Sequence, residues 1–359
     1  MKVSIIISDI SKTGGTERAV VTLANMLCKK KYNVFIISLS KTENEKSYYK
    51  IDDKVSLVFL NNDILPHELL RKIKWSLTTV LLLRKYFKNT NEDFIISTGH
   101  NNNWLLPFVK TNNQTKLIAC EHIVYSSIPK VSRLFMRLTY RFLDKIVVLS
   151  EKANQSFYKY SKVVVIPNAV SFKTEKVSQL IEKQILMVGR LSTEKGLERL
   201  VLISTHLKQK FPDWKIIIVG DGPERNRVEK LIKEADLIDF VILKGASTDV
   251  KSYYLNSSIY IMTSYFEAFP MVLLEAQSFG LPVVVFDCPE GPNQIIDNNN
   301  GFLVENGDII EFSEKVAILI KDEILRKEFS INAKNNSNKY SEENIIARWT
   351  FLFKEMKII

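Results

Sequence analysis

Two glutamates, Glu267 and Glu275, lie eight residues apart around an apolar segment that contains a helix start. Pro270 suits the first turn of that helix, so Glu267 falls in the preceding loop and Glu275 lies about 7 Å further along the axis at 1.5 Å per residue. Free N–H groups of the helix start lie between the two carboxylates, at Phe269, Met271 and Val272. Two hydroxyl acceptors around an anion-binding helix end suit a sugar, a diphosphate and a ribose in that order. The spacing alone is equally typical of a cap and a solvated position, but an unpaired carboxylate in an apolar run is costly.

A second candidate segment, residues 189 to 196, follows a predicted strand and combines two glycines with two cations. Gly189 and Gly196 flank Arg190, which carries a planar fork of donors, and Lys195, which carries a mobile point charge. Ligands of open α/β sheets bind at such strand ends, and this pair of cations suits a leaving diphosphate. One basic residue there is usually solvated, but two around a glycine turn favour a binding function.

Two further glycine turns lie between a predicted strand and a predicted helix. Gly15 and Thr16 open the first helix and offer free N–H groups to a diphosphate, although a simple turn capped by Thr16 explains them as well. Gly220, in Gly220-Asp221-Gly222-Pro223, allows close backbone approach to a ligand, although a tight turn explains this motif fully. Both turns are therefore weak signals on their own.

Short β-branched runs alternate with helical patterns along nearly the whole chain, which predicts parallel sheets built of strand–helix–strand units. At 359 residues the chain exceeds the roughly 250 to 300 residues of a single core, so we expect two Rossmann-like domains. The expected domains are 1–175 for the acceptor and 176–340 for the donor, with a helix over 341–359 packing back toward the first. The predicted fold is α/β, with two parallel sheets facing across an interdomain cleft. The predicted strands are 2–8, 33–39, 55–60, 93–98, 116–121, 146–149, 162–166, 184–188, 214–219, 240–243, 259–263 and 282–286, and the first predicted helix is 16–30.

Composition excludes several other classes of protein. Apolar residues make up 46% of the chain and charged residues 25%, which is typical of a soluble globular protein. No run reaches the roughly 18 apolar residues of a spanning helix, and the N-terminus is typical of a strand rather than a signal peptide, so we expect a cytoplasmic protein. Three widely separated cysteines, without a neighbouring His cluster, indicate neither a disulfide framework nor a metal site.

Positive charge is concentrated in the N-terminal half. Residues 1–180 hold 28 Lys/Arg and 14 Asp/Glu, a net +14, whereas residues 181–359 hold 22 and 26, a net −4. The segment 130–145 predicts a basic amphipathic helix with Arg133, Arg137 and Arg141, and the segment 68–88 repeats the pattern with Lys72 and Lys85. These segments suit an anionic membrane surface, and two Lys-rich helices packing on the sheet are the alternative. Nucleic acid is not an expected partner, because no recognised fold or aromatic-basic motif supports it.

Together these motifs resemble the retaining group 1 glycosyltransferases, which have the two-domain GT-B fold. The resemblance runs nearly from end to end, and it is carried by Gly14-Gly15-Thr16-Glu17-Arg18, Glu121-His122, Val165-Ile166-Pro167-Asn168, Gly189-Arg190, Lys195-Gly196, Gly220-Asp221-Gly222-Pro223, the two glutamates and Gly280-Leu281-Pro282-Val283. It implies a metal-independent transferase that needs no cofactor and keeps the anomeric configuration. No protein nucleophile is implied.

The resemblance also implies roles for individual residues on the donor side. Arg190 and Lys195 would bind the donor diphosphate and stabilise the leaving group. Glu275 would hold the ribose hydroxyls, and Glu267 would contact the transferred sugar. Gly15 would let its loop close over the phosphates.

On the acceptor side, the resemblance places His122 beside the reacting sugar, with His100 as a second candidate. The segment Cys288-Pro289-Glu290-Gly291-Pro292-Asn293 resembles a loop of bacterial polysaccharide-building members and favours a UDP-hexose or UDP-N-acetylhexosamine donor. The expected acceptor is a glycan linked to polyprenyl diphosphate, used by an enzyme associated peripherally with the inner face of the cell membrane. Two alternatives stay open: a UDP-sugar 2-epimerase on the same fold, and a non-catalytic subunit that binds nucleotide sugars.

Overall fold

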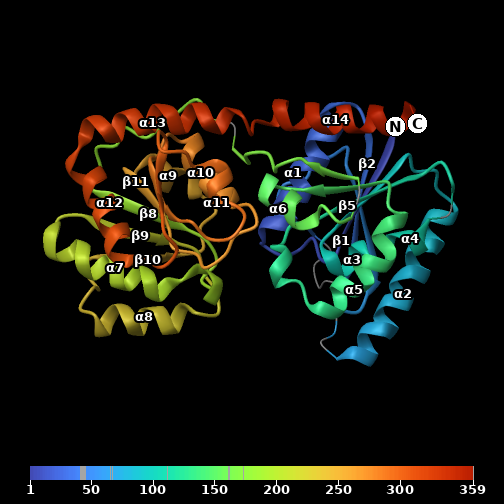
Figure 1. The fold of residues 1–359 in the computed structure, drawn as a ribbon, viewed down its shortest axis with the longest axis horizontal. Helices are drawn as coiled ribbons and strands as arrows, with labels where there is room; N and C mark the ends of the chain where they lie inside the picture. Colours follow the sequence, from blue (N-terminus) through green and yellow to red (C-terminus); the bar gives the residue numbers. More distant parts are fainter. Residues whose placement is uncertain are drawn as a thin grey trace. The chain divides into compact units, whose positions relative to one another are not determined.

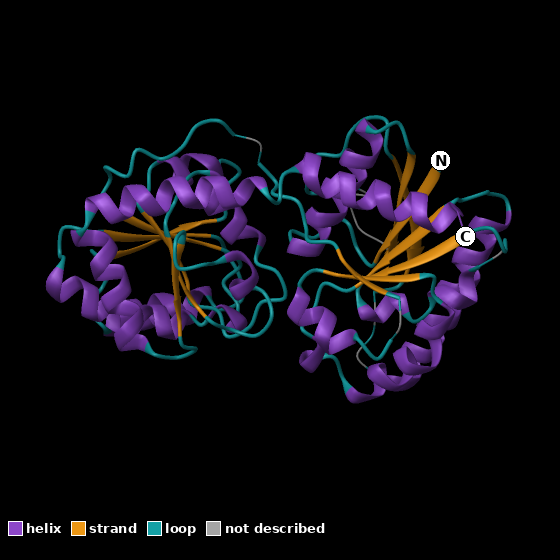
Figure 2. Cartoon of the chain, turned by 45° about the horizontal axis from the view of Figure 1, so that its top comes forward, coloured by secondary structure: helices purple, strands orange, loops and turns teal. Residues whose placement is uncertain are grey.

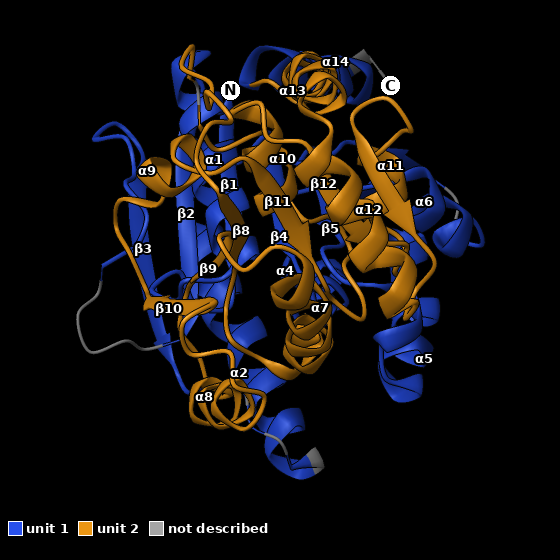
Figure 3. Cartoon of the chain, turned by 90° about the vertical axis from the view of Figure 1, so that its left-hand side faces the viewer, with its two compact units in different colours: residues 1–169, 342–359 blue, residues 170–341 orange. Residues whose placement is uncertain are grey.

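The computed structural model describes residues 1–40, 46–64, 66, 68–110, 112–160, 162–172 and 174–358. The chain forms two compact units (Figure 3). Unit 1 comprises residues 1–169 with 342–359, and unit 2 comprises residues 170–341. The chain therefore passes between the units twice, at 169–170 and 341–342, against a predicted boundary near 175 and a predicted final segment from 341.

Unit 1 is built on a parallel sheet of seven strands in the order β3-β2-β1-β4-β5-β6-β7 (Figure 1). The strands are β1 (Lys2–Ile7), β2 (Asn33–Ser40), β3 (Ser56–Asn62), β4 (Phe94–Thr98), β5 (Lys116–Cys120), β6 (Lys145–Val148) and β7 (Val163–Val165). Its helices are α1 (Gly15–Lys29), α2 (Leu69–Lys88), α3 (His100–Asn103), α4 (Leu106–Val109), α5 (Lys130–Thr139), α6 (Glu151–Phe157) and α14 (Glu342–Ile358), with short 3-10 turns η1 (Tyr125–Ser127) and η2 (Tyr140–Phe142).

Helices cover both faces of this sheet (Figure 2). On one face, α1 and α14 bury their apolar stripes in a core that includes Leu23 and Trp349. Phe353 of α14 stacks on Phe94 of β4 at 4.2 Å between ring centroids. The opposite core receives Trp75 of α2. The C-terminal helix is thus part of the core of unit 1, because its apolar side chains cover a sheet face.

Unit 2 repeats the plan with six parallel strands in the order β10-β9-β8-β11-β12-β13. The strands are β8 (Gln184–Val188), β9 (Lys215–Val219), β10 (Val241–Gly245), β11 (Ile259–Met262), β12 (Val283–Phe286) and β13 (Gly301–Val304). Its helices are α7 (Leu197–Lys210), α8 (Arg225–Glu234), α9 (Val250–Leu255), α10 (Met271–Ser278), α11 (Pro292–Ile295), α12 (Ile309–Lys321) and α13 (Glu323–Asn338), with the 3-10 turn η3 (Thr193–Lys195).

The predicted α/β class with two parallel sheets is confirmed. Each of the twelve predicted strands is present, and the first helix is at 15–29. Strand β13 was not predicted, because Gly-Phe-Leu-Val is short and follows an Asn-rich turn. The predicted basic helix over 130–145 is wrong in extent: α5 ends at Thr139, Arg141 lies in η2, and Lys145 begins β6 opposite Ile118.

Candidate active site

The strand order of unit 2 brings several loops together at one edge of the sheet. Strand β8 pairs with β9 on one side and with β11 on the other, so the chain reverses its direction of winding between β8 and β11. Ligands of open α/β sheets bind outside the carboxyl ends of the strands at such a switch point. The segment 189–196 follows β8, and Glu267 follows β11, so both predicted donor-binding segments flank this position.

An ion pair joins these two loops. Lys195 Nζ lies 2.6 Å from Glu267 Oε1, and the two side chains are 18% and 14% exposed. Ser264 Oγ donates a second hydrogen bond to the same oxygen, at 2.8 Å. Burial alone would lower the pKa of Lys195, but the Glu267 carboxylate raises it above its ordinary value. Lys195 is therefore a fully charged ammonium held at the switch point.

Glycines make the close approach of these loops possible. Gly196 has φ 60°, and a Cβ there would lie 2.3 Å from the carbonyl oxygen of Thr263. Thr263 Oγ1 in turn donates to the Lys195 carbonyl at 2.9 Å. Gly220 has φ 146°, and a Cβ there would lie 1.8 Å from the Gly189 carbonyl oxygen. Both glycines are required because a side chain would push the loop bearing Lys195 off its neighbours.

Arg190, predicted as the second cation, has an exposed side chain. Its carbonyl accepts from the Ser192 N–H at 3.0 Å. Within the described part of the chain, Lys195 and not Arg190 provides the ion pair to Glu267. The structure therefore brings Lys195 and Glu267 together and leaves the Arg190 guanidinium on the surface.

Glu275 lies in α10, with its side chain fully buried. The Tyr254 hydroxyl donates to Glu275 Oε2 at 3.1 Å. Helix α10 begins at Met271 with Pro270 as its N-cap rather than in its first turn, and its first N–H groups lie between the two glutamates along the chain. Phe269 and Met271 are buried at this helix start and Val272 is half-buried. The sequence did not predict Tyr254 as a partner of Glu275, because Tyr254 lies on α9, 21 residues away along the chain.

The loop after β12 contacts the backbone of Glu267. The Gly291 N–H donates to the Glu267 carbonyl at 2.9 Å, and Glu290 forms a parallel bridge with Glu267. A Cβ on Gly291 would lie 2.6 Å from Cδ of Pro270. Cys288 is buried in this loop, and burial together with the nearby Glu267 charge raises the pKa of its thiol to about 12. The sequence offered one signal for this support, the glycine in the 288–293 motif.

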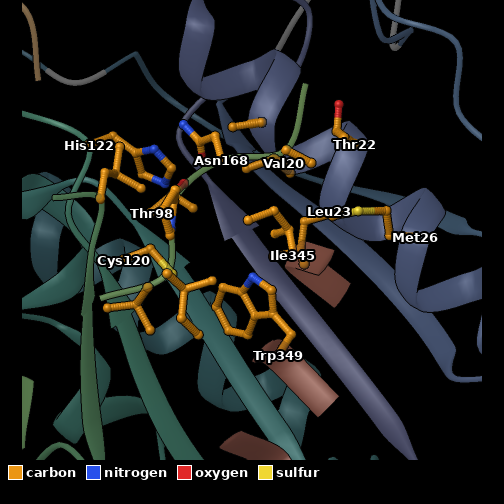
Figure 4. A pocket seen from close by; sticks show the side chains of 16 residues that line it. Val20, Thr22, Leu23, Met26, Thr98, Cys120, His122, Asn168, Ile345 and Trp349 are labelled. Atoms are coloured by element: carbon orange, nitrogen blue, oxygen red, sulfur yellow. The ribbon is translucent and has the colours of Figure 1, made fainter. Parts of the chain in front are cut away.

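In unit 1, His122 follows β5 and lines a cavity of about 30 Å³ together with Thr98, Cys120, Asn168, Ile345 and Trp349 (Figure 4). Burial lowers the pKa of His122 to about 4, so the imidazole is neutral at pH 7. His100 begins α3 at the end of the neighbouring strand β4, and burial, with the Lys72 charge, lowers its pKa as well. Both candidate histidines thus lie at carboxyl strand ends of the same sheet.

The N-cap of α1 differs from the Thr16 cap of the simple-turn alternative. Gly14 is the N-cap, with extended backbone angles, so Gly15 and Thr16 are the first helical residues. Gly15 is exposed, and a Cβ there would meet nothing within 4 Å. The Glu17 carboxylate accepts from backbone N–H groups of Glu17 and Gly14 at this helix start, whereas Gly15 leaves the start sterically open.

The basic segments of unit 1 expose apolar stripes. On α2, Leu70, Ile73, Leu77 and Leu81 are exposed at helical spacing, while Trp75 and Leu83 are buried. On α5, Val131, Leu134, Phe135 and Leu138 are exposed in the same manner. Lys85, Arg137 and Arg141 are exposed, and Lys72 and Arg133 are half-buried. Both helices carry more apolar surface outward than a solvated helix normally does.

None of the helices in the described ranges is long and apolar enough to cross a membrane. Among the residues that the structure describes, no group of three or more His, Cys, Asp or Glu side chains could hold a metal ion.

Comparison with known proteins gives consistent matches along the chain. Residues 171–336 match the family "Glycosyl transferases group 1", and residues 13–173 match "Glycosyltransferase Family 4". The chain is 32% identical to an Erwinia amylovora protein named amylovoran biosynthesis glycosyltransferase AmsD, over 97% of this chain and 98% of the relative. It is 30% identical to an α-1,4-N-acetyl-D-galactosaminyltransferase of Campylobacter jejuni, over 99% of each. That relative is named for an acceptor on undecaprenyl diphosphate.

Among solved structures, the pneumococcal O-GlcNAc transferase GtfA in complex with UDP and GlcNAc superposes with a TM-score of 0.81. The match covers 99% of each chain at 15% identity, so it shows a shared fold. That fold is the predicted GT-B architecture. The chain belongs to the group 1 glycosyltransferases.

Proposed function

We propose that this glycosyltransferase moves a hexose or N-acetylhexosamine from a UDP-sugar to a glycan acceptor during assembly of a bacterial surface polysaccharide or lipid-linked oligosaccharide. The observation that carries the proposal is the Lys195–Glu267 ion pair at the switch point of unit 2. A half-buried, charged lysine beside a carboxylate and a helix start is suited to an anionic leaving group with an attached sugar.

The proposal assigns tasks to four side chains of unit 2. Lys195 and Arg190 neutralise the charge that builds on the departing diphosphate, and the N–H groups at the start of α10 add to them. Glu267 accepts from a hydroxyl of the transferred sugar, and Glu275 accepts from the ribose hydroxyls. The sugar keeps its anomeric configuration, and no metal takes part.

In unit 1, the neutral His122 contacts the reacting sugar or the acceptor hydroxyl. The lowered pKa supports this task, because a neutral imidazole both donates and accepts a hydrogen bond, whereas an imidazolium only donates. Gly15 and Thr16 present their backbone N–H groups at the start of α1 to donor phosphates. Asn168 and Thr98 line the same cavity as His122 and complete its polar end.

UDP is the favoured nucleotide, because GtfA of the same fold was solved with UDP and GlcNAc. A polyprenyl-diphosphate-linked acceptor is supported by the undecaprenyl compound in the name of the Campylobacter relative. The exposed apolar stripes of α2 and α5, with cations along them, suit peripheral docking on the anionic inner face of the cell membrane. This docking would keep the enzyme where such acceptors are anchored.

The test is a screen of UDP- and other nucleotide sugars for binding and slow hydrolysis, followed by mass analysis of lipid-linked products. We expect UDP-hexoses or UDP-N-acetylhexosamines to bind, and the product to gain the mass of one sugar only when an acceptor is present. Conversion of the donor to its 2-epimer without any acceptor would instead establish the epimerase. Tight binding without turnover on any acceptor tested would favour the non-catalytic subunit.

A further inference from the structure

Glu121 is a buried carboxylate next to His122 that the proposed mechanism does not use. It directly follows β5, its residue is 3% exposed, and its N–H donates to the Val147 carbonyl at 2.9 Å. A buried carboxyl group is costly unless its partners stabilise it strongly. Its presence at the residue before His122 therefore calls for a physical reason.

Two donors converge on one oxygen of this group. The Tyr140 hydroxyl donates to Glu121 Oε1 in a short hydrogen bond. Asn103 Nδ2 donates to the same oxygen at 2.7 Å and to the Cys120 carbonyl at 2.9 Å. The carboxyl thus joins three elements, since Tyr140 belongs to η2, Asn103 to α3 and Glu121 to the end of β5.

Pairing with the neighbouring strands does not require this cluster. Strand β5 already makes parallel ladders with β4 and β6, and its apolar residues are buried. An apolar side chain at position 121 would satisfy the fold at lower desolvation cost. Burial raises the pKa of Glu121 to about 7, which shows how strongly the surroundings oppose its charge.

Contacts of Tyr125 also hold the C-terminal end of the turn that carries His122. Arg133 of α5 lies over the ring of Tyr125 in η1, with its guanidinium carbon 5.4 Å from the ring centroid. The rings of Tyr140 and Tyr160 lie 5.3 Å apart, and the Tyr160 hydroxyl is 3.3 Å from that of Tyr125. The turn from 121 to 127 is therefore held at its start through Tyr140 and again at Tyr125.

We propose that Glu121 and Tyr140 are positioning residues that fix the backbone on either side of His122 and so aim its imidazole. They act through His122 and touch neither donor nor acceptor, because Glu121 and Tyr140 are both buried. The inference rests on the role that the proposed function gives to His122. It adds the reason why a buried acid precedes that histidine.

The test compares Tyr140→Phe, Glu121→Ala and Glu121→Gln with the wild-type chain. Tyr32→Phe is the matched control, because Tyr32 is a partly buried tyrosine of the same unit that packs on Phe353. Turnover is followed as UDP released from the sugar donor that the screen identifies, UDP affinity by calorimetry, and folding by circular dichroism. We expect Tyr140→Phe and Glu121→Ala to lower kcat about 10- to 100-fold per folded molecule, as misplaced catalytic groups do. Dissociation constants for UDP should stay within about twofold, because neither Glu121 nor Tyr140 belongs to the proposed donor site.

Glu121→Gln keeps an acceptor oxygen for both donors, so it should recover most of the kcat that Glu121→Ala loses. His122→Asn provides the decisive background. When Tyr140→Phe is added to His122→Asn, kcat should fall by less than about a further twofold, because the effects of residues that act through one group are not additive.

Two results would overturn the inference alone: kcat of Tyr140→Phe within twofold of wild type while His122→Asn is impaired, or a Tyr140→Phe loss that persists undiminished in the His122→Asn background. Wild-type kcat in His122→Asn itself would remove the proposed role of His122 and the inference with it.

Discussion

The Lys195–Glu267 pair of unit 2 and the Glu121–Tyr140 cluster of unit 1 handle charge in opposite ways. Lys195 and Glu267 retain some exposure and form an ion pair, and the Glu267 carboxylate stabilises the charged form of Lys195. Glu121 and His122 are in surroundings that favour their neutral forms, with pKa values of about 7 and about 4. In the proposed function, this difference lets unit 2 stabilise developing negative charge, whereas unit 1 orients uncharged hydrogen-bonding groups.

Of the predicted effects, the loss of activity on removal of Lys195 should be the largest. Lys195→Ala removes a preorganised cation, so we expect kcat to fall about 10²- to 10³-fold. The dissociation constant for the UDP-sugar should rise less than kcat falls, because charge on the diphosphate increases as the bond breaks. Initial rates over a range of donor concentrations separate the two quantities.

Lys183→Ala is the matched control, since Lys183 forms an exposed ion pair with Asp213 in the same unit. Its kinetics should equal those of the wild type. Equal kinetics for Lys195→Ala as well would remove Lys195 from the donor site.

A smaller effect is expected for the buried glutamate of α10. Glu275→Ala should weaken UDP-sugar binding about 10- to 100-fold, because hydrogen bonds to a charged acceptor contribute roughly 1.5–3 kcal/mol. Calorimetric titration with UDP measures it directly. Tyr254→Phe removes the hydroxyl that donates to Glu275 and leaves the carboxylate in place, so it should bind UDP more tightly than Glu275→Ala does. Equal binding by Glu275→Ala and wild type would exclude ribose recognition by this residue.

The lowered pKa of His122 predicts a pH-dependent stability. Because the folded pKa of His122 is about 4, below its ordinary value near 6.5, the unfolded chain binds more protons in this range and stability is lost as pH falls from 6.5 toward 4. At pH 5 the loss amounts to about 2 kcal/mol. His122→Asn should not show this loss of stability. Between pH 7.5 and pH 5 in urea titrations, the free energy of unfolding of the variant should therefore rise relative to that of the wild type by about 2 kcal/mol. A constant difference across this range would show that His122 titrates normally.

The smallest predicted effect concerns the docking surface. Arg137→Gln should weaken binding to vesicles containing anionic lipid about fivefold, as expected for about 1 kcal/mol per cation near the surface. Binding to neutral vesicles should change little. Lys210→Gln, at an exposed cation of unit 2, is the control in the same sedimentation assay. Equal losses in both variants would mean that α5 contributes no special docking surface.

Much of the fold could be predicted because buried parallel strands appear as short β-branched runs. The helix start at Met271 was visible from Pro270, and the glycine turns were visible at 196 and 220. Strand β13 was missed because four residues beginning with glycine do not form such a run.

The contacts within the site could not be predicted in the same way. Lys195 and Glu267 are separated by 72 residues, and their pairing depends on the adjacency of β8 and β11, which spacing along the chain does not reveal. The partners of Glu275 and Glu121, Tyr254 and Tyr140, are also brought in by tertiary packing from separate helical elements. Strand order therefore determines which of the predicted residues meet.

The most direct test of the central claim is a crystal structure of the chain with UDP bound. We expect the diphosphate to lie within hydrogen-bonding distance of Lys195 Nζ and the N–H groups at the start of α10, with the ribose hydroxyls at Glu275. A UDP molecule bound in unit 2 away from Lys195 and α10 would contradict the assignment of the donor site.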